Sequence, residues 1–457
     1  MKRYTLSALS AAILAASSAH ASQWFNMETQ PFFDDATLDI HLRNYYRNND
    51  ANDEGITDKD DAAKSQSSWA QAVRMEFSSG YLHNLIGIDL GADYALKLKG
   101  KEDRSSTGLL PIDSEGKSHG FGHTSYALRV NLFDMGEARY GRMFVNTPLL
   151  NDSDSRALSS LTEGFYAEGH FGTASMYGLW ANKHISRDQS GSEKYGYIDT
   201  STGKTKSEPV KIIGSSYDFG HGIHSNIAVG QQDERIRRYF TEVNYLWDGE
   251  QLSIDLGAQY ARNEHIGKAK DFYENNSNES INQDFWGAST AFYWRGAKIN
   301  LTYAQVDKSD IFDEFYYQWN KAESTSTFGS GMDYSNDNSS FFGYNDSQIS
   351  SFNQSGQRSW GIHASYDFDQ WVEGLKISAA YVEGKVHPKD NDEDKWKEKE
   401  YNLSVDWYVP MVEGLSGHIQ YGHNTQEEQG RNSTDSDKKD IVTKDTRVII
   451  KYDIAVF

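Results

Sequence analysis

Apolar and polar residues alternate along much of the chain, with interruptions, from Leu38 to the last residues. The clearest stretch covers residues 85–98, where Ile, Leu, Ala and Tyr share one parity and Gly, Asp, Ala and Lys share the other. Because successive side chains of a β-strand point to opposite faces, this pattern predicts a strand with one apolar and one polar face. The stretch exceeds the ~5–6 residues of an average globular strand and suits the ~9–11 tilted residues that cross a bilayer.

The same period of two recurs in other segments, and several of their apolar rows contain or end in an aromatic residue. These segments are 38–42, 126–132, 252–260, 360–368 and 401–407. Aromatic residues belong at these ends if the apolar row faces lipid and its end lies in the headgroup zone. The connections between the segments are either short turns or long stretches rich in Asp, Asn, Ser, Gly and Lys. This alternation of short and long connections is typical of outer-membrane barrels.

The composition favours a membrane barrel over a soluble β-sandwich or an exported β-propeller. Hydrophobic residues make up 37% of the chain, aromatic residues 13%, and no cysteine is present. A closed barrel can combine a polar lumen and polar loops with a modest lipid-facing band and aromatic girdles. We therefore predict an all-β fold, a transmembrane antiparallel β-barrel with short periplasmic turns and long extracellular loops.

The first residues have the features of a secretory signal. Lys2 and Arg3 precede a short apolar segment at 6–16, and an A-x-A cleavage site follows at 19–21. This predicts a removed signal peptide at 1–21 and a single transmembrane barrel domain at 22–457, with inward-folded constriction loops. A cleaved signal and a membrane barrel together place the protein in the outer membrane of a Gram-negative bacterium.

The formal net charge of −21 argues against nucleic acid as a partner, because a nucleic-acid binder needs a basic surface for the phosphates. We expect outer-membrane lipid, lipopolysaccharide and small hydrophilic solutes as partners. The acidic loops fit either simple solubility or weak binding of divalent cations. The pattern is compatible with a monomer and with a loose homotrimer.

Three groups of short motifs follow one another in an order that resembles a known family. The first is at 32–38 and 43–46, the second at 141–143, 147–149 and 152–156, and the third at 357–360, 372–376, 380–384, 413–415 and 447–457. Together they are similar to the OprD family of outer-membrane substrate-specific porins. The likeness extends over nearly all of the chain after the signal.

This resemblance implies a barrel of about eighteen strands, within the even-numbered range of bacterial barrels. It also implies a lumen narrowed by inward-folded loops, with basic residues on one wall and acidic residues facing them. Members of the family take up small nutrients, including basic amino acids, aromatic and other carboxylates, and in some cases chitin-derived sugars.

The first candidate for the pore constriction is the stretch 151–156, which contains Asp152, Asp154 and Arg156. The resemblance places it where the family's loop folds into the pore. An arginine presents a rigid fork to a carboxylate or a hydroxyl group, and an aspartate accepts from an ammonium or a hydroxyl group. The alternative interpretation is an ordinary Asp/Ser turn with a local ion pair.

Basic residues on the polar parity of the predicted strands form a second candidate, a basic track along the lumen. They are Arg43, Arg74, Arg129, Arg447 and Lys451. A Lys or Arg near the middle of the lipid face would cost ~2–4 kcal/mol, so these side chains should face the lumen. The alternative, compatible with the first, is that each pairs with a lumen carboxylate such as Glu76 or Asp89 and stiffens the barrel.

A third candidate is Asp346 with Ser347, beside the aromatic residues Phe341, Phe342 and Tyr344. This later loop could dip into the mouth of the pore, where aromatic faces stack on sugar rings or cations. The alternative is a solvent-exposed loop tip.

The function that these patterns predict is passive, moderately selective diffusion of small hydrophilic nutrients such as amino acids, small carboxylates or short oligosaccharides. The alternatives are a chitooligosaccharide-specific porin and, from another class, a barrel enzyme or an adhesin. The chain has no G-x-S-x-G elbow and no H-E-x-x-H pair, so no enzymatic activity is expected. Neither a cofactor nor a metal site is predicted.

Overall fold

The computed structural model describes residues 30–53, 66–100, 107–199, 204–276, 282–308, 319–321, 343–387, 395–427 and 440–457. The predicted signal peptide lies outside these residues and stays a prediction. The described strands form a closed antiparallel barrel of eighteen strands, which confirms the predicted fold class.

The barrel strands follow one another around the wall in chain order. They are β1 (Thr37–Asp53), β2 (Gln66–Ser78), β3 (Ile86–Gly100), β4 (Phe121–Asn131), β5 (Gly136–Met143), β8 (Leu161–Phe171), β9 (Ala174–Ile185), β13 (Val210–Gly220), β14 (Ile223–Gln232), β15 (Ile236–Asp248), β16 (Ser253–His265), β17 (Asn282–Trp294), β18 (Ala297–Val306), β20 (Gln357–Asp367), β21 (Leu375–Val386), β22 (Trp396–Tyr408), β23 (Leu415–Glu427) and β24 (Ile441–Ala455).

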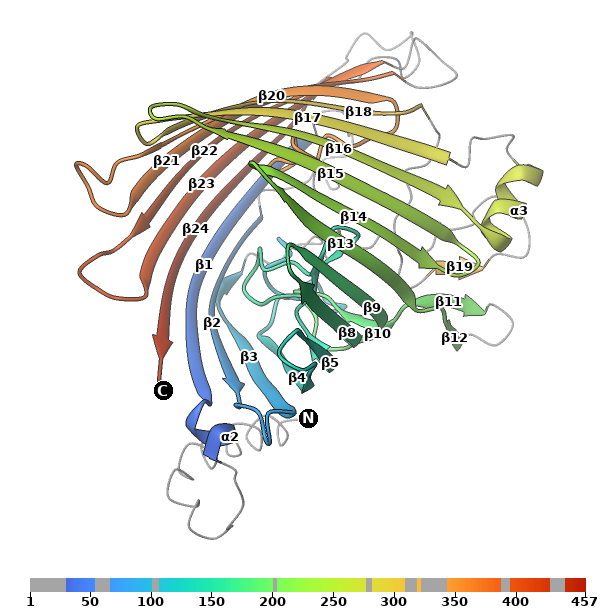
Figure 1. Cartoon of the computed structure of the whole chain (residues 1–457). Helices are drawn as coiled ribbons and strands as arrows, with labels where there is room; N and C mark the ends of the chain where they lie inside the picture. The colour runs from blue at the N-terminus through green and yellow to red at the C-terminus, as the bar shows by residue number, and fades with distance from the viewer. Residues whose placement is uncertain are drawn as a thin grey trace.

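The first and last strands close the barrel. β1 pairs with β24 from Asp39 opposite Ala455 to Asp53 opposite Ile441, and Figure 1 shows the blue β1 beside the red β24. Closure leaves no unpaired strand edge. A sheet in lipid requires this, because unpaired backbone groups there have no water to bind. Since the strands alternate in direction, β1 begins and β24 ends on the side of the short turns.

Two-residue turns join several neighbouring strands at this side. His221 and Gly222 connect β13 to β14 with φ of 54° and 80°, and Arg295 and Gly296 connect β17 to β18 with φ of 44° and 82°. Two consecutive positive φ values define a type I′ turn, whose twist matches that of the flanking strands.

The apolar parity of the strands faces outward. In β3, Leu90, Tyr94, Leu96 and Leu98 are exposed, whereas Ala95, on the other parity, is buried. The exposed row is the one that meets lipid, so the polar parity lines the lumen. The predicted lipid and lumen faces of this strand are therefore the ones that the structure has.

The remaining elements are short. They are the helices α2 (Gln30–Asp34) and α3 (Gly267–Asn276) and the strands β6 (Asn146–Thr147), β7 (Leu150–Asn151), β10 (Glu193–Lys194), β11 (Gly196–Asp199), β12 (Lys204–Ser207) and β19 (Trp319–Lys321). Within the described residues, neither helix has the length and apolar character needed to span a membrane.

Candidate functional site

The loop 144–160, which joins β5 to β8, packs inside the barrel against two parts of the wall. Leu149 and Leu150 belong to an apolar cluster with inward side chains from β9 and β13–β18. Ala157 and Leu158 belong to a second cluster with residues of β1–β3. Because it contacts both parts of the wall, this loop extends across the lumen.

Asp152 holds this loop in shape from within. Its carboxylate accepts hydrogen bonds from the Val145 amide at 2.9 Å and from the hydroxyl groups of Ser160 and Thr162 at 3.2 Å. The residue is 2% exposed. Burial raises the pKa of Asp152 to about 7, although the hydrogen bonds to its carboxylate act to lower it. This position differs from the expected pore-facing carboxylate: Asp152 lies inside the loop and does not meet the open lumen.

Asp154 fastens the same loop to the barrel wall. Its carboxylate receives a bidentate contact from Arg43, at 2.6 and 3.0 Å, and a third hydrogen bond from Arg74 at 2.9 Å. Partial burial opposes ionisation, but the hydrogen bonds and charge of Arg43, with the charge of Arg74, lower the pKa of Asp154 to about 2. The carboxylate therefore stays ionised and paired across the ordinary pH range.

Arg156 lies in the loop without a carboxylate partner among the described residues. It is 8% exposed, its Nη1 donates only to the carbonyl and hydroxyl oxygens of Ser155, and its Nε has no partner. Burial, with the charges of Arg47 and Arg187, lowers the pKa of Arg156 well below its ordinary value. A guanidinium nevertheless stays protonated in proteins, so the same forces favour an anion beside it.

Two further charged residues that the sequence interpretation missed complete the wall beside Arg447. Arg47 contacts the carboxylate of Asp445 through Nε and Nη2 at 2.9 Å, and Arg447 contacts the same carboxylate at 2.6 Å. Arg47 and Arg447 stand directly opposite each other on β1 and β24, and Asp445 is fully buried between them. The sequence pattern could have indicated both residues, because Arg47 shares the polar parity of Arg43 and Asp445 shares that of Arg447.

Four of the five predicted track residues lie together on β24, β1 and β2. Lys451 stands opposite Arg43, Arg447 stands opposite Arg47, and Arg74 stands opposite His41. At ~3.3 Å per residue, the rows from Arg47 to His41 extend over about 20 Å along the wall. These residues therefore form one basic strip beside the loop 144–160.

Arg129 lies apart from this strip, on β4 near the short-turn end of the strand. It forms ion pairs with Asp89 at 2.9 Å and Glu137 at 3.4 Å and donates to the carbonyl of Ser79. Its guanidinium also lies 4.9 Å from the ring centroid of Tyr81. These contacts are with strands of the wall and with the short connection between β2 and β3, so Arg129 fits the interpretation that the basic residues pair with lumen carboxylates and stiffen the barrel.

A second inward segment, residues 343–350, docks on the facing strands. The carboxylate of Glu400 accepts from the amides of Ile349 and Ser350 at 2.9 Å. The carbonyl of Gln348 accepts from Arg447 at 2.8 Å, and the hydroxyl of Tyr344 donates to Glu242 at 3.0 Å. These contacts hold the segment inside the barrel, against β15, β22 and β24.

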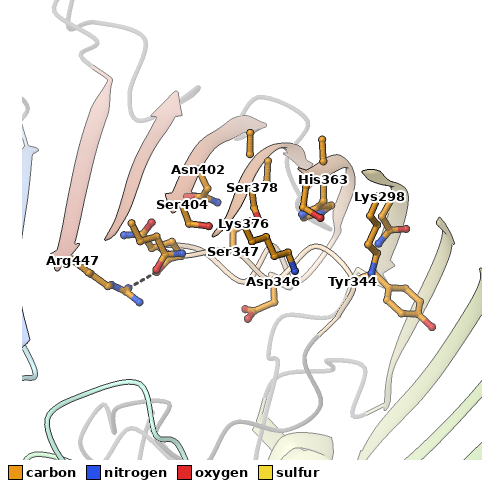
Figure 2. Close-up of a pocket in the computed structure, with 17 residues that line it drawn as sticks. Lys298, Tyr344, Asp346, Ser347, His363, Lys376, Ser378, Asn402, Ser404 and Arg447 are labelled. Atoms are coloured by element: carbon orange, nitrogen blue, oxygen red, sulfur yellow. Dashed lines mark hydrogen bonds between the residues drawn. The ribbon is translucent and has the colours of Figure 1, made fainter. Parts of the chain in front are cut away.

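A recess of about 540 Å³ lies between this segment and the wall, and Figure 2 shows Arg447 at one end of it and Lys298 with Tyr344 at the other. Asp346 and Ser347, both predicted from the sequence, line it. Burial, with the charge of Glu400, raises the pKa of Asp346 to about 6. Phe341 and Phe342 lie outside the described residues.

The charges of this recess are unequal. Lys298, Lys376 and Arg447 line it, whereas Asp346 is its only carboxylate among the described residues. Neither lysine forms an ion pair within the described part of the chain: Lys298 lies 5.0 Å from the ring of Tyr293, and the nearby Asp406 pairs with His418 at 2.6 Å. The recess therefore carries excess positive charge.

Several recess residues also have buried polar atoms without a protein partner. They are Oδ1 of Asn300, Oε1 of Gln348, Nε2 of His363 and Oδ1 of Asn402. Amide oxygens accept hydrogen bonds, so a hydroxyl group or a water molecule would complete them. The arrangement can hold an anionic group through the lysines and a hydroxyl group through the amides. No group of three or more potential metal ligands lies together among the residues that the structure describes.

The closed barrel, its two inward segments and its charged lumen wall are the features of a channel. The family model described as outer membrane porin, OprD family, matches residues 30–456. The chain belongs to this family: it is a porin of the Gram-negative outer membrane, as the sequence motifs predict.

Particular relatives extend this result. Porin D of Pseudomonas aeruginosa is 25% identical over 409 residues, covering 84% of this chain and 82% of the relative. The chitoporin of Escherichia coli is 21% identical over 400 residues, covering 83% and 80%. The crystal structure of Pseudomonas aeruginosa OccK9 (OpdG) aligns with a TM-score of 0.74 at 19% identity, over 93% of this chain and all of that one. Pseudomonas aeruginosa OpdK, solved with vanillate, aligns with a TM-score of 0.72 at 19% identity, over 93% of this chain and 100% of that one.

Proposed function

We propose that this porin passes small anionic solutes that carry hydroxyl groups, such as hydroxylated carboxylates, by passive diffusion and without covalent chemistry. The loop 144–160 and the segment 343–350 form the constriction, and the recess between the segment and the wall is the selective region. A solute carboxylate contacts Lys298 or Lys376, and its hydroxyl groups donate to the amide oxygens of the recess.

The observation that carries the proposal is the distribution of paired and unpaired charges. Asp154 and Asp445 are each engaged by two arginines, and Asp152 is buried, so these carboxylates are not available for a cationic solute. Lys298, Lys376 and Arg156 have no carboxylate partner among the described residues. Anions therefore gain more from this recess than cations do.

Two other solute classes have less support. Basic amino acids require free carboxylates, and among the described residues the recess offers only Asp346. Chitooligosaccharides favour stacking on several aromatic rings, and Tyr344 is the one aromatic residue in the described lining. The related channel OpdK, solved with vanillate, agrees with the proposed class.

Liposome swelling and planar-bilayer recordings test the proposal. The panel contains vanillate, its uncharged amide, arginine and chitotriose. We expect the carboxylate to enter fastest and the Lys298→Gln/Lys376→Gln double variant to lose about fivefold or more of that preference, since each ion contact contributes ~1 kcal/mol or less in a wet lumen.

The matched control is Lys211→Gln, which removes a positive charge from the outer surface of the barrel and should leave permeation unchanged. Equal entry of vanillate and its amide into wild-type vesicles would overturn the anionic class. Faster entry of arginine or chitotriose would assign the channel to that solute instead.

A further inference from the structure

Three cations stand side by side on the outer surface of the barrel, at its long-loop end. Arg358 of β20 is opposite Lys385 of β21, and Lys385 is opposite Lys397 of β22. They share the outward parity of Trp360, Tyr381 and Tyr401 on the same three strands. We name this group the rim triad.

The aromatic row places the triad at the level of the lipid headgroups. The rings of Trp360 and Tyr381 are 5.4 Å apart, and those of Tyr381 and Tyr401 are 4.8 Å apart, so the three form a continuous outward-facing band. Such bands mark the boundary between hydrocarbon and headgroups. The triad lies two to four residues beyond the band, or ~7–14 Å along the strands, which is the polar zone of the outer leaflet.

The triad forms no ion pair within the described part of the protein. No described carboxylate forms an ion pair with Arg358, Lys385 or Lys397, although the chain contains 66 acidic residues against 45 basic ones. The nearby Glu383 accepts from the hydroxyl of Tyr381, and the register places Glu427 opposite Lys397 at the end of β23. Like charges directly opposite each other destabilise a sheet unless an anion lies between them.

Strands β13–β17, which lie on the other side of β18 from the triad, show a different arrangement at their long-loop end. There, three outward cations have a carboxylate partner: Lys211 with Asp233 at 2.6 Å, Arg237 with Glu264 at 3.4 Å, and Arg262 with Asp284 at 3.6 Å. These three cations are already neutralised by the protein and need no external anion. The difference between the two groups of strands is local, since in both groups the charged residues lie beyond outward-facing aromatic residues.

We propose that the rim triad binds the phosphate groups of an outer-leaflet glycolipid, which places a specific lipid site on β20–β22. An arginine and two lysines in one row suit a phosphate, because the guanidinium binds two oxygens and the ammonium groups act as point charges. Acyl chains of the same lipid lie against the aromatic band below. The site is independent of the lumen and of the proposed solute.

Binding of bisphosphorylated lipid A to the full-length protein in detergent tests the proposal by native mass spectrometry. The triple variant Arg358→Gln/Lys385→Gln/Lys397→Gln should bind about tenfold or more weakly, as each basic residue near a charged lipid surface contributes about 1 kcal/mol. The matched control, Lys211→Gln/Arg237→Gln/Arg262→Gln, should bind like the wild type. The variant Arg358→Lys/Lys385→Arg/Lys397→Arg keeps the charges and should retain binding.

Further arms separate the phosphate from its possible competitors. Dephosphorylated lipid A should bind weakly to all variants, and millimolar inorganic phosphate should leave the lipid complex intact. Equal binding by the triple variant and its control, or displacement by inorganic phosphate, would overturn the site. The acidic stretch 390–394 connects β21 to β22. A variant in which these acidic residues are replaced by Asn and Gln provides the last comparison. If the unmodified protein did not bind lipid A and this variant did, the acidic stretch would be the partner of the triad and the proposal would be wrong.

Discussion

The strip on β24, β1 and β2 and the recess behind residues 343–350 both contain cations, but they use them differently. In the strip, two arginines share Asp445 and two share Asp154. Asp445 joins β24 to β1, and Asp154 joins the loop 144–160 to β1 and β2. In the recess, Lys298 and Lys376 face open space without an ion pair among the described residues. A basic wall is therefore not uniformly available to a solute: paired arginines stabilise the channel, and unpaired cations remain to bind what passes through it.

The largest effect should come from removing the shared carboxylate of the strip. We expect Asp445→Asn to lower the free energy of unfolding by ~3–5 kcal/mol, because it leaves the buried Arg47 and the mostly buried Arg447 without their counter-ion. Urea unfolding in detergent, followed by tryptophan fluorescence, measures the loss. Asp453→Asn is the control, since Asp453 lies on the same strand and pairs with His41 at the exposed end. Equal losses in the two variants would contradict the special role of Asp445.

A smaller effect is expected when the loop 144–160 loses its ionic anchor. Asp154→Asn should cost ~1–3 kcal/mol, the range for hydrogen bonds to a charged group, at the lower end because the side chain is 39% exposed. The less restrained loop should give a larger single-channel conductance in planar bilayers.

The pKa of Asp154 gives a second readout for the same anchor. The folded-state pKa is depressed to about 2, so the stabilisation is present above the ordinary aspartate pKa and is lost only as pH falls through the folded value. Titration of Asp154 should therefore cause no change in wild-type conductance between pH 7 and about pH 4. A step at pH 4–5 that disappears in Asp154→Asn would contradict the assigned pairing.

Arg156 and Arg43 provide a direct comparison of an unpaired with a paired arginine. Arg156→Gln should leave the free energy of unfolding unchanged or raise it, because it removes a buried guanidinium that has no carboxylate partner among the described residues. It should lower the anion/cation permeability ratio about two- to fivefold. Arg43→Gln should reduce stability instead. If the stability loss were larger in Arg156→Gln than in Arg43→Gln, the distinction between the two would be lost.

The smallest effect concerns Asp346, the described carboxylate of the recess. Its pKa is raised to about 6, so it is ionised at pH 7 and protonated at pH 5. Acidification then removes a negative charge beside Lys376, and entry of an anion that stays ionised at both pH values should increase about twofold. The Asp346→Asn variant should show the faster entry at both pH values, and a wild-type pH response that persists in it would assign the titration to another group.

Some of the site could be predicted from single positions in the alternating pattern. Arg43, Arg74, Arg447 and Lys451 share the polar parity of their strands, and the structure brings them together. Arg47, Lys298 and Lys376 show the same signal and could have been included. The family motif indicates the stretch 151–156 as an inward loop. It does not indicate that Asp152 stabilises the loop from within while Asp154 attaches it to the wall.

The pairings themselves could not be predicted, because they join residues far apart in the chain. Arg47 and Asp445 are separated by 398 positions, and Arg43 and Asp154 by 111. Their contact depends on the closing register of β1 with β24 and on the inward path of a loop. A shift of that register by one residue would turn the inward side chains of one of the two strands toward lipid and separate Arg47 from Asp445.

The sequence by itself determined that the chain forms a membrane barrel and which parity meets lipid. This follows because the period of two is a local property: each residue is selected for the solvent on its own face, whatever lies elsewhere in the chain. Only the tertiary structure decided which lumen charges neutralise one another and which stay available. Ion pairing depends on distances of a few ångströms between distant segments, and closure of the barrel and insertion of the two loop segments set those distances.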